Sequence, residues 1–252
     1  MSASSAPLAS SAPSAPSLPS ALPDWTAHPP AALLRWGAFF TVATALAIVA
    51  LDAPMARLLG HWEPASFWGE LLTVLEWPAL LQLKKRVYLI GPFELNATRW
   101  AFALGLGAIT AISLAVPRFR PAARGWAFVF FTHLIARLAM VELKETTERL
   151  RPSEWLAAGG GPTFWVKGGL SFPSGHVTYF LSLLLPAAIV FPRWRKPLLA
   201  IVALVAACRI AENAHFASDV TGAVALVCGV CFAVAAALPR SLSPWQWRSR
   251  AS

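Results

Sequence analysis

The sequence predicts an all-α integral membrane protein: a bundle of six spanning helices, with an additional interfacial helix between helices one and two. Hydrophobic residues make up 57% of the 252 residues and charged residues only 13%, whereas soluble domains carry about 25% charged residues. The apolar residues come in long runs, not in alternating or amphipathic patterns. Composition and pattern together exclude a chain that is disordered as a whole and disfavour an ordinary soluble enzyme.

Six runs have the length and composition expected of a membrane-spanning helix, which takes about 20 mostly apolar residues. They cover residues 32–51, 99–116, 125–141, 175–191, 197–211 and 220–238. A further apolar stretch, residues 67–83, contains Glu70, Glu76 and Pro78. These residues favour a position in the interface for that stretch, which keeps the number of spanning helices even.

The two ends of the chain differ in composition from the apolar centre. Residues 1–30 are almost entirely Ser, Ala and Pro, a composition that predicts a disordered tail. The membrane domain then covers residues 31–239, and residues 240–252 form a short basic tail.

Basic residues without acidic neighbours gather in two connections and in the C-terminal tail. They follow the second, fourth and sixth helices: Arg118, Arg120, Arg124, Arg193, Arg195, Lys196, Arg240, Arg248 and Arg250. By the positive-inside rule these segments and both termini face the cytoplasm. These nine residues account for the net charge of +9, and the remaining 12 basic residues balance the 12 acidic ones. Because the basic residues are split among short segments, the sequence predicts no nucleic-acid partner.

The first candidate cluster lies at the outer end of the third helix, from Lys144 to Pro152. If the helix continues, Lys144 and Arg151 are two turns apart and point the same way. Taken alone, the pair is also compatible with a lysine that snorkels to the interface and a helix that stops at Pro152.

The second cluster is Pro173-Ser174-Gly175-His176, immediately before the fourth helix. Ser174 can cap the helix, and the backbone N–H groups of Gly175 and His176 then form an anion-binding helix start. His176 adds a titratable proton donor. A capped helix with an incidental histidine is the alternative.

The third cluster, between the fifth and sixth helices, contains Arg209, Glu212, His215 and Asp219. His215 and Asp219 are four residues apart, so on a helix the carboxylate can hold one imidazole nitrogen and make the other more nucleophilic. A His–Asp pair alone is also compatible with a metal site or a helix cap. The nearby cations favour a phosphate over a metal ion.

The predicted topology places all three clusters on the same, outer side of the membrane. Two histidines, three cations, one carboxylate and an anion-binding helix start can then converge on one oxyanion. The motifs also resemble those of the type-2 phosphatidic acid phosphatase superfamily, the lipid phosphate phosphatases. The resemblance covers roughly residues 65–238 and rests on the Lys144/Arg151-Pro152, Pro173 to His176, and Arg209/His215/Asp219 spacings. Cys208 stands where the family usually has Ser.

The resemblance implies a role for each matching position. His215 is the expected nucleophile, which forms a phosphohistidine, and Asp219 orients it. His176 is the expected proton donor to the leaving group. The phosphate oxygens are then held by Lys144, Arg151, Ser174, Gly175 and Arg209. No metal or other cofactor is expected.

The sequence therefore predicts a lipid phosphatase of a bacterial inner membrane, acting at the periplasmic or outer face. Membrane lipids are the expected partners, and the family implies phosphatidic acid, phosphatidylglycerol phosphate, undecaprenyl diphosphate or lipid A phosphate as candidate substrates. A lipid phosphotransferase that uses the same phosphohistidine and a non-enzymatic anion transporter are the alternatives. The substrate and the oligomeric state stay open.

Overall fold

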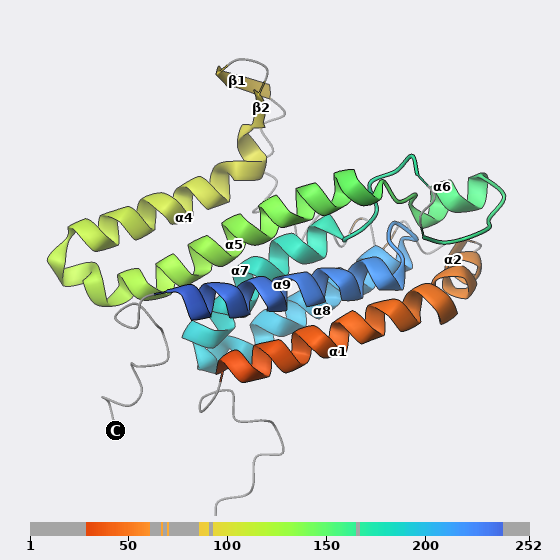
Figure 1. Ribbon diagram of the computed structural model, residues 1–252. Coiled ribbons are helices and arrows are strands. Elements are labelled where there is room, and N and C mark those ends of the chain that lie inside the picture. The colour runs from red at the N-terminus through yellow and green to blue at the C-terminus, as the bar shows by residue number, and fades with distance from the viewer. Residues whose placement is uncertain are drawn as a thin grey trace, which may run out of the picture.

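The computed structural model describes residues 29–60, 67, 70, 86–90, 93–164 and 167–238. The long helices run side by side along one axis (Figure 1). They are α1 (Pro29–Ala50), α4 (Ala97–Ala115), α5 (Arg120–Thr147), α7 (Gly175–Val190), α8 (Arg195–Ala211) and α9 (Ala217–Ala237).

Shorter elements connect or flank these helices. The helix α2 (Asp52–Gly60) follows α1, and α6 (Pro152–Ala157) follows α5. The single 3-10 turns η1 (Pro117–Phe119) and η2 (Pro192–Trp194) join α4 to α5 and α7 to α8. Each of them begins with proline, whose fixed φ suits the first position of a helical turn. An antiparallel hairpin of β1 (Arg86–Ile90) and β2 (Phe93–Asn96) precedes α4.

Each of the six predicted apolar runs forms a helix, so the bundle is all-helical as expected. Within the described residues, three helical stretches are long and apolar enough to cross a membrane: Ala31–Ala50, Ala122–Thr147 and Ala217–Ala237. Two further stretches, Phe102–Ala115 and Gly175–Val190, are apolar but shorter. The chain thus has the helices of a membrane protein, while six spans stay a prediction. The predicted interfacial helix and nearly all of both predicted tails lie outside the described residues.

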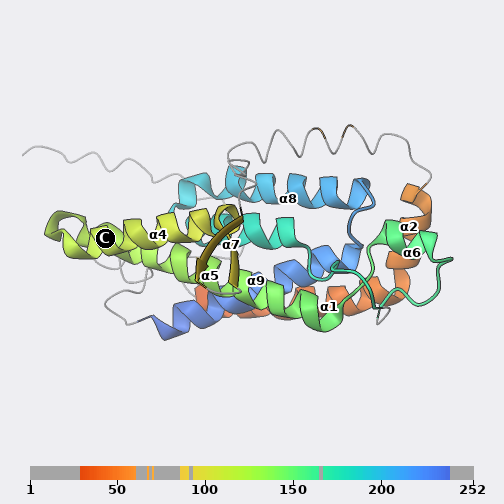
Figure 2. The ribbon, with the colours of Figure 1, turned by 90° about the horizontal axis from the view of Figure 1, so that it is seen from above.

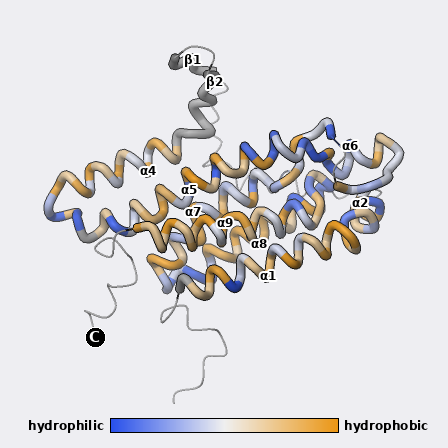
Figure 3. Tube along the Cα trace, in the orientation of Figure 1, coloured by the Kyte–Doolittle hydropathy of each residue, from blue (hydrophilic) through white to orange (hydrophobic). Residues whose placement is uncertain are grey.

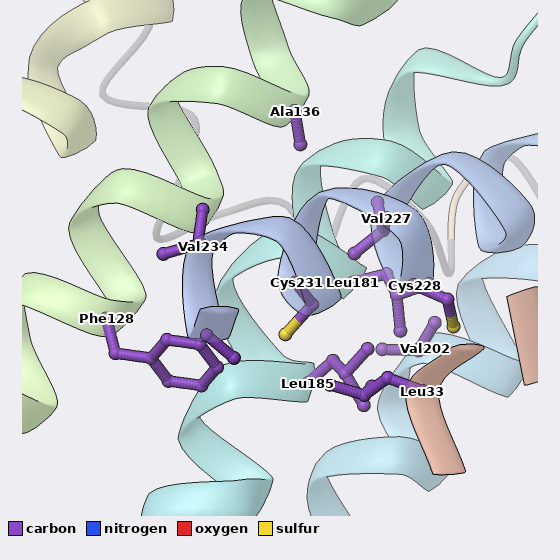
Figure 4. Close-up of a cluster of buried hydrophobic side chains, with 11 residues drawn as sticks. Leu33, Phe128, Ala136, Leu181, Leu185, Val202, Val227, Cys228, Cys231 and Val234 are labelled. Carbon is purple, nitrogen blue, oxygen red and sulfur yellow. The ribbon is translucent and has the colours of Figure 1, made fainter. Parts of the chain in front are cut away.

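The helix α9 lies at the centre of the bundle, where it packs against α1, α5 and α7. The helix α8 packs on α7, and α4 lies on the outer side of α5 (Figure 2). Apolar side chains fill the interior, including Val227, Cys228, Cys231 and Val234 of α9 (Figure 4). Cys228 and Cys231, which form a Cys-x-x-Cys pair, therefore pack in the apolar core.

One end of the bundle is built differently from the rest. There α2 and α6 lie beside the C-terminal end of α5 and the start of α9 (Figure 1). Hydrophilic residues gather at this end, whereas the bundle axis is mostly hydrophobic (Figure 3). The fold therefore brings polar side chains from separate parts of the chain to a single end.

Candidate active site

The three predicted clusters meet at this polar end of the bundle. The electrostatic neighbours of Lys144, on α5, include Arg151 at the start of α6, Arg209 of α8 and Asp219 of α9. A Cβ built on Gly175 would lie 3.6 Å from Cε of Lys144, so the first and second motifs are in contact. The convergence expected from topology is therefore present in the fold.

Lys144 and Arg151 reach this region by a different route from the one predicted. The helix α5 ends at Thr147, because Glu148 adopts a left-handed conformation with φ of 46°. Arg151 is therefore not two turns further along the same helix but stands at the N-cap of α6. The Lys144 ammonium donates to the carbonyls of Leu170 and Ser171, which ties α5 to the segment that leads into the second motif.

Ser174 occupies the N-cap position of α7, as predicted, but its hydroxyl makes no capping hydrogen bond. Its side chain is fully buried, and Oγ has no hydrogen-bond partner among the described residues. The Ser174 amide instead donates to the carbonyl of Asp219 at 3.0 Å, which fixes the start of α7 against the start of α9. Because the first N–H groups of a helix lack intrahelical acceptors, this turn presents donors next to Lys144.

His215 and Asp219 form the expected pair, with 3.4 Å between Nδ1 and Oδ2. They do not share a helical face, because His215 precedes α9 and Asp219 lies in its first turn. The Asp219 carboxylate accepts from the Phe216 amide at 2.9 Å and from the Ser171 hydroxyl. The Ser171 oxygen also lies 3.3 Å from Nδ1 of His215. Ser171 thus joins the imidazole and the carboxylate on the Nδ1 side of the ring.

The environment of His215 favours a neutral imidazole. Burial lowers the pKa of His215 from 6.5 to about 4, and the hydrogen-bonded carboxylate of Asp219 only partly opposes this shift. The cations Lys144 and Arg209 lower the pKa further. A neutral imidazole retains a lone pair at neutral pH, which a nucleophile requires.

Arg149 is the central buried residue of this end, and the sequence interpretation gave it no role. Its side chain is 1% exposed and lies between the rings of Phe164 and Phe216, with Cζ 4.7 and 4.2 Å from the ring centroids. Nη1 donates to Asp219 at 2.6 Å, and Nε donates to the Thr163 carbonyl at 2.7 Å. Arg149 therefore fixes the second oxygen of the carboxylate beside His215.

Arg209 forms an ion pair with Glu212. Nη1 of Arg209 donates to Oε2 of Glu212, three residues later, at 2.6 Å. One residue earlier, Cys208 is fully buried in a cluster that includes Val177 and Val205. The cysteine that replaces the usual serine is thus a packing residue that does not disturb Arg209.

A small hollow adjoins His215. Its walls come from α2 with Asp52, Met55, Ala56 and Leu59, from Pro152, and from Ile210, Asn213, His215, Phe216 and Ala217. Among the described residues no three His, Cys, Asp or Glu side chains gather in a way that could hold a metal ion. The polar atoms that face this end suit an oxyanion.

The sequence reasoning missed Asp52, Arg149, Ser171 and Ser218, all of which are buried. Arg149 lies two residues before Arg151, and this second arginine beside the first motif could have marked it as a candidate site residue. Asp52 gave no signal, since a single carboxylate after an apolar run also occurs at ordinary helix starts.

Comparison with known proteins agrees with the motifs. The chain is 28% identical over 200 residues to a lipid A 1-phosphatase of Rhizobium johnstonii, an alignment that covers 76% of each protein. No solved structure matches the chain. The model of the PAP2 superfamily matches residues 125–243, the segment that contains Lys144, Ser174, His215 and Asp219. The matched segment contains all three motifs, so the resemblance expected from the sequence is confirmed as a match of residues 125–243 to the PAP2 superfamily.

Proposed function

We propose that the protein is an integral membrane lipid phosphatase that hydrolyses a phosphate ester or diphosphate of a lipid through a phosphohistidine. The observation that carries this proposal is the state of His215. Its Nδ1 side faces Asp219 and Ser171, so Nε2 is the nitrogen available for attack. The low pKa of about 4 keeps that nitrogen unprotonated at neutral pH.

In the proposed first step, Nε2 of His215 attacks phosphorus in line. The P–N bond forms as the bond from phosphorus to the leaving oxygen breaks, and His176 donates a proton to that oxygen. In the second step water attacks the phosphohistidine, His176 accepts a proton from it, and inorganic phosphate leaves. Asp219 stays ionised throughout and stabilises the charge that develops on the imidazole.

The negative charge on the phosphoryl oxygens is balanced by cations and donors around the site. Lys144, Arg151 and Arg209 supply positive charge, and the hydroxyl of Ser174 and the amide of Gly175 supply hydrogen-bond donors. The unpartnered, buried Oγ of Ser174 supports this role. Such donors are worth most where water is excluded, as at this buried end.

The arrangement of the helices favours a site on the outer face. The basic turns around η1 and η2 connect the helix ends opposite to those that form the site. Under the positive-inside rule that opposite end is cytoplasmic. Because the similar Rhizobium johnstonii protein is a lipid A 1-phosphatase, a phosphate on lipid A is the first substrate to test.

The test is release of inorganic phosphate by the purified protein from a panel of lipid phosphates in detergent, without an added acceptor lipid. We expect wild-type protein to release phosphate, and His215→Ala and His176→Ala to lose this activity while remaining folded. Glu148→Gln, which changes an exposed side chain near the site, is the control and should keep the activity. Retained turnover in His215→Ala would refute the mechanism, and release only with an acceptor lipid would indicate a phosphotransferase.

A further inference from the structure

Asp52 lies outside the segment that matches the PAP2 superfamily, yet its carboxylate reaches the same buried network. It stands in the first turn of α2, and its side chain has no exposed surface. Oδ2 accepts from Nη2 of Arg149 at 2.7 Å, and Oδ1 accepts from the Ser218 amide at 3.1 Å. The Ser218 hydroxyl also donates to Oδ2. Asp52 thus joins α2 to Arg149 and to the first turn of α9.

The guanidinium of Arg149 is divided between two carboxylates. Nη2 faces Asp52, and Nη1 faces Asp219 at 2.6 Å. The planar fork fixes these two directions relative to each other, so a partner on one nitrogen orients the other. The Ser218 oxygen, 2.6 Å from Nη1, braces the same side. Asp52 is therefore one of the groups that fix the position of Nη1, together with Ser218 and the Thr163 carbonyl.

The position of Nη1 matters because of what Asp219 contacts. One oxygen of this carboxylate accepts from Arg149, and the other faces His215 and accepts from Ser171. Without Asp52, the guanidinium of Arg149 can turn to bind both oxygens of Asp219, and it then competes with His215 for Oδ2. The charge beside His215 would change as well. Without the Asp52 carboxylate, Arg149 pairs with Asp219 alone and neutralises the charge of Asp219 more fully.

We propose that Asp52 is a positioning residue for catalysis, acting through Arg149 and Asp219 on the orientation of His215. The α1–α2 segment would then be part of the catalytic unit, although it precedes the matched residues 125–243. This inference rests on the proposed phosphatase activity, because it assigns Asp52 an effect on the attack by Nε2. The hollow beside His215 is consistent with it, since Asp52 and Met55 form part of its wall.

The experiment compares Asp52→Asn with wild type and with the control Glu148→Gln, which makes the same acid-to-amide change at an exposed position. The measurements are kcat, KM and inhibition by orthovanadate and by inorganic phosphate. Orthovanadate adopts the five-coordinate geometry of the in-line transition state and bonds to the attacking nitrogen, whereas phosphate resembles the ground state. Loss of folded molecules lowers kcat but leaves both inhibition constants unchanged.

For Asp52→Asn we expect kcat to fall about 10- to 100-fold, the range seen when a group that orients a functional histidine is removed. KM and the inhibition constant of phosphate should stay within about twofold of the wild-type values. The inhibition constant of orthovanadate should rise by about the same factor by which kcat/KM falls. Asp52→Glu should recover part of the lost kcat. Ser218→Ala, which keeps the charges and removes one brace, should show a smaller loss of the same kind.

Unchanged kcat in Asp52→Asn, or a loss of kcat with unchanged orthovanadate inhibition, would overturn the proposal and leave Asp52 a purely structural residue. If neither Asp52 variant yields folded protein, Ser218→Ala decides between the same two outcomes. The proposed function fails separately, because in that case wild-type protein releases no phosphate from any lipid phosphate in the panel.

Discussion

Replacing Arg149 with methionine, which keeps most of the volume of the side chain, should strongly destabilise the protein. The change removes the guanidinium from between Asp52 and Asp219, whose side chains have no exposed surface. Breaking one buried ion pair by removing a partner costs about 3–5 kcal/mol, because a buried charge is left uncompensated. Here two carboxylates lose their cation, so we expect a loss at the upper end, about 5 kcal/mol.

A destabilisation of this size corresponds to a fall in Tm of about 10–20 °C for a chain of about 250 residues. Thermal unfolding of the purified protein in detergent, followed by near-ultraviolet circular dichroism of its tryptophans, measures it. Lys167→Gln is the matched control, since Lys167 forms a 3.4 Å pair with Glu148 in which the side chains are 73% and 47% exposed. Such an exposed pair contributes only about 0–1 kcal/mol.

Adding Asp52→Asn to Arg149→Met should restore part of the lost stability, because it removes one of the two uncompensated charges. The predicted role of Arg149 in stability is refuted if the Tm of Arg149→Met lies within a few degrees of that of wild type. It is also refuted if Asp52→Asn lowers the Tm of Arg149→Met further.

Three further predictions concern packing, pH and the bridge beside the nucleophile. Gly222→Ala would place a methyl group against the ring of Phe172, which precedes the second motif. We expect this variant to lower the free energy of unfolding by about 1–3 kcal/mol, measured by thermal unfolding. Gly229→Ala is the control and should not destabilise the protein, because nothing lies within 4 Å of the added methyl group. Because burial lowers the pKa of His215 to about 4, kcat/KM should fall with decreasing pH only near pH 4; an acid limb near 6.5 assigned to this residue would contradict the burial argument. Ser171→Ala removes a buried hydroxyl that bridges His215 and Asp219. Loss of a hydrogen bond worth about 1–2 kcal/mol should lower kcat about 5- to 30-fold. An unchanged kcat would show that this bridge does not contribute to catalysis.

The helices were predictable because a segment within lipid needs apolar side chains and must satisfy its backbone hydrogen bonds internally. A long apolar run therefore indicates a helix. For α7 the predicted start, Gly175, is also the observed one, since the proline and serine before it end the preceding segment. The end of α5 was not predictable in this way. Its polar last turns continue past the apolar run, and the stop depends on the left-handed conformation of Glu148, which is not a residue that marks such a stop in a sequence.

The residues proposed to contact phosphate could be predicted from the sequence, but the buried residues behind them could not. Lys144, His176 and His215 belong to three motifs whose combined spacing indicates a phosphate site. Asp52 and Arg149 act by their contacts with each other and with Asp219, across 97 and 70 positions of the chain. Contacts at such separations follow from the packing of α2 against α6 and α9, which no local pattern encodes.

The most direct test of the phosphohistidine mechanism is to trap phosphate on the protein during a single turnover with a radiolabelled lipid phosphate. The reaction is quenched in base, where phosphohistidine survives, and the labelled peptide is identified by mass spectrometry. We expect the label on His215 in wild-type protein, no label in His215→Ala, and loss of the label on exposure to acid. Complete turnover of the lipid by wild-type protein with no label at any time on His215 would contradict this mechanism.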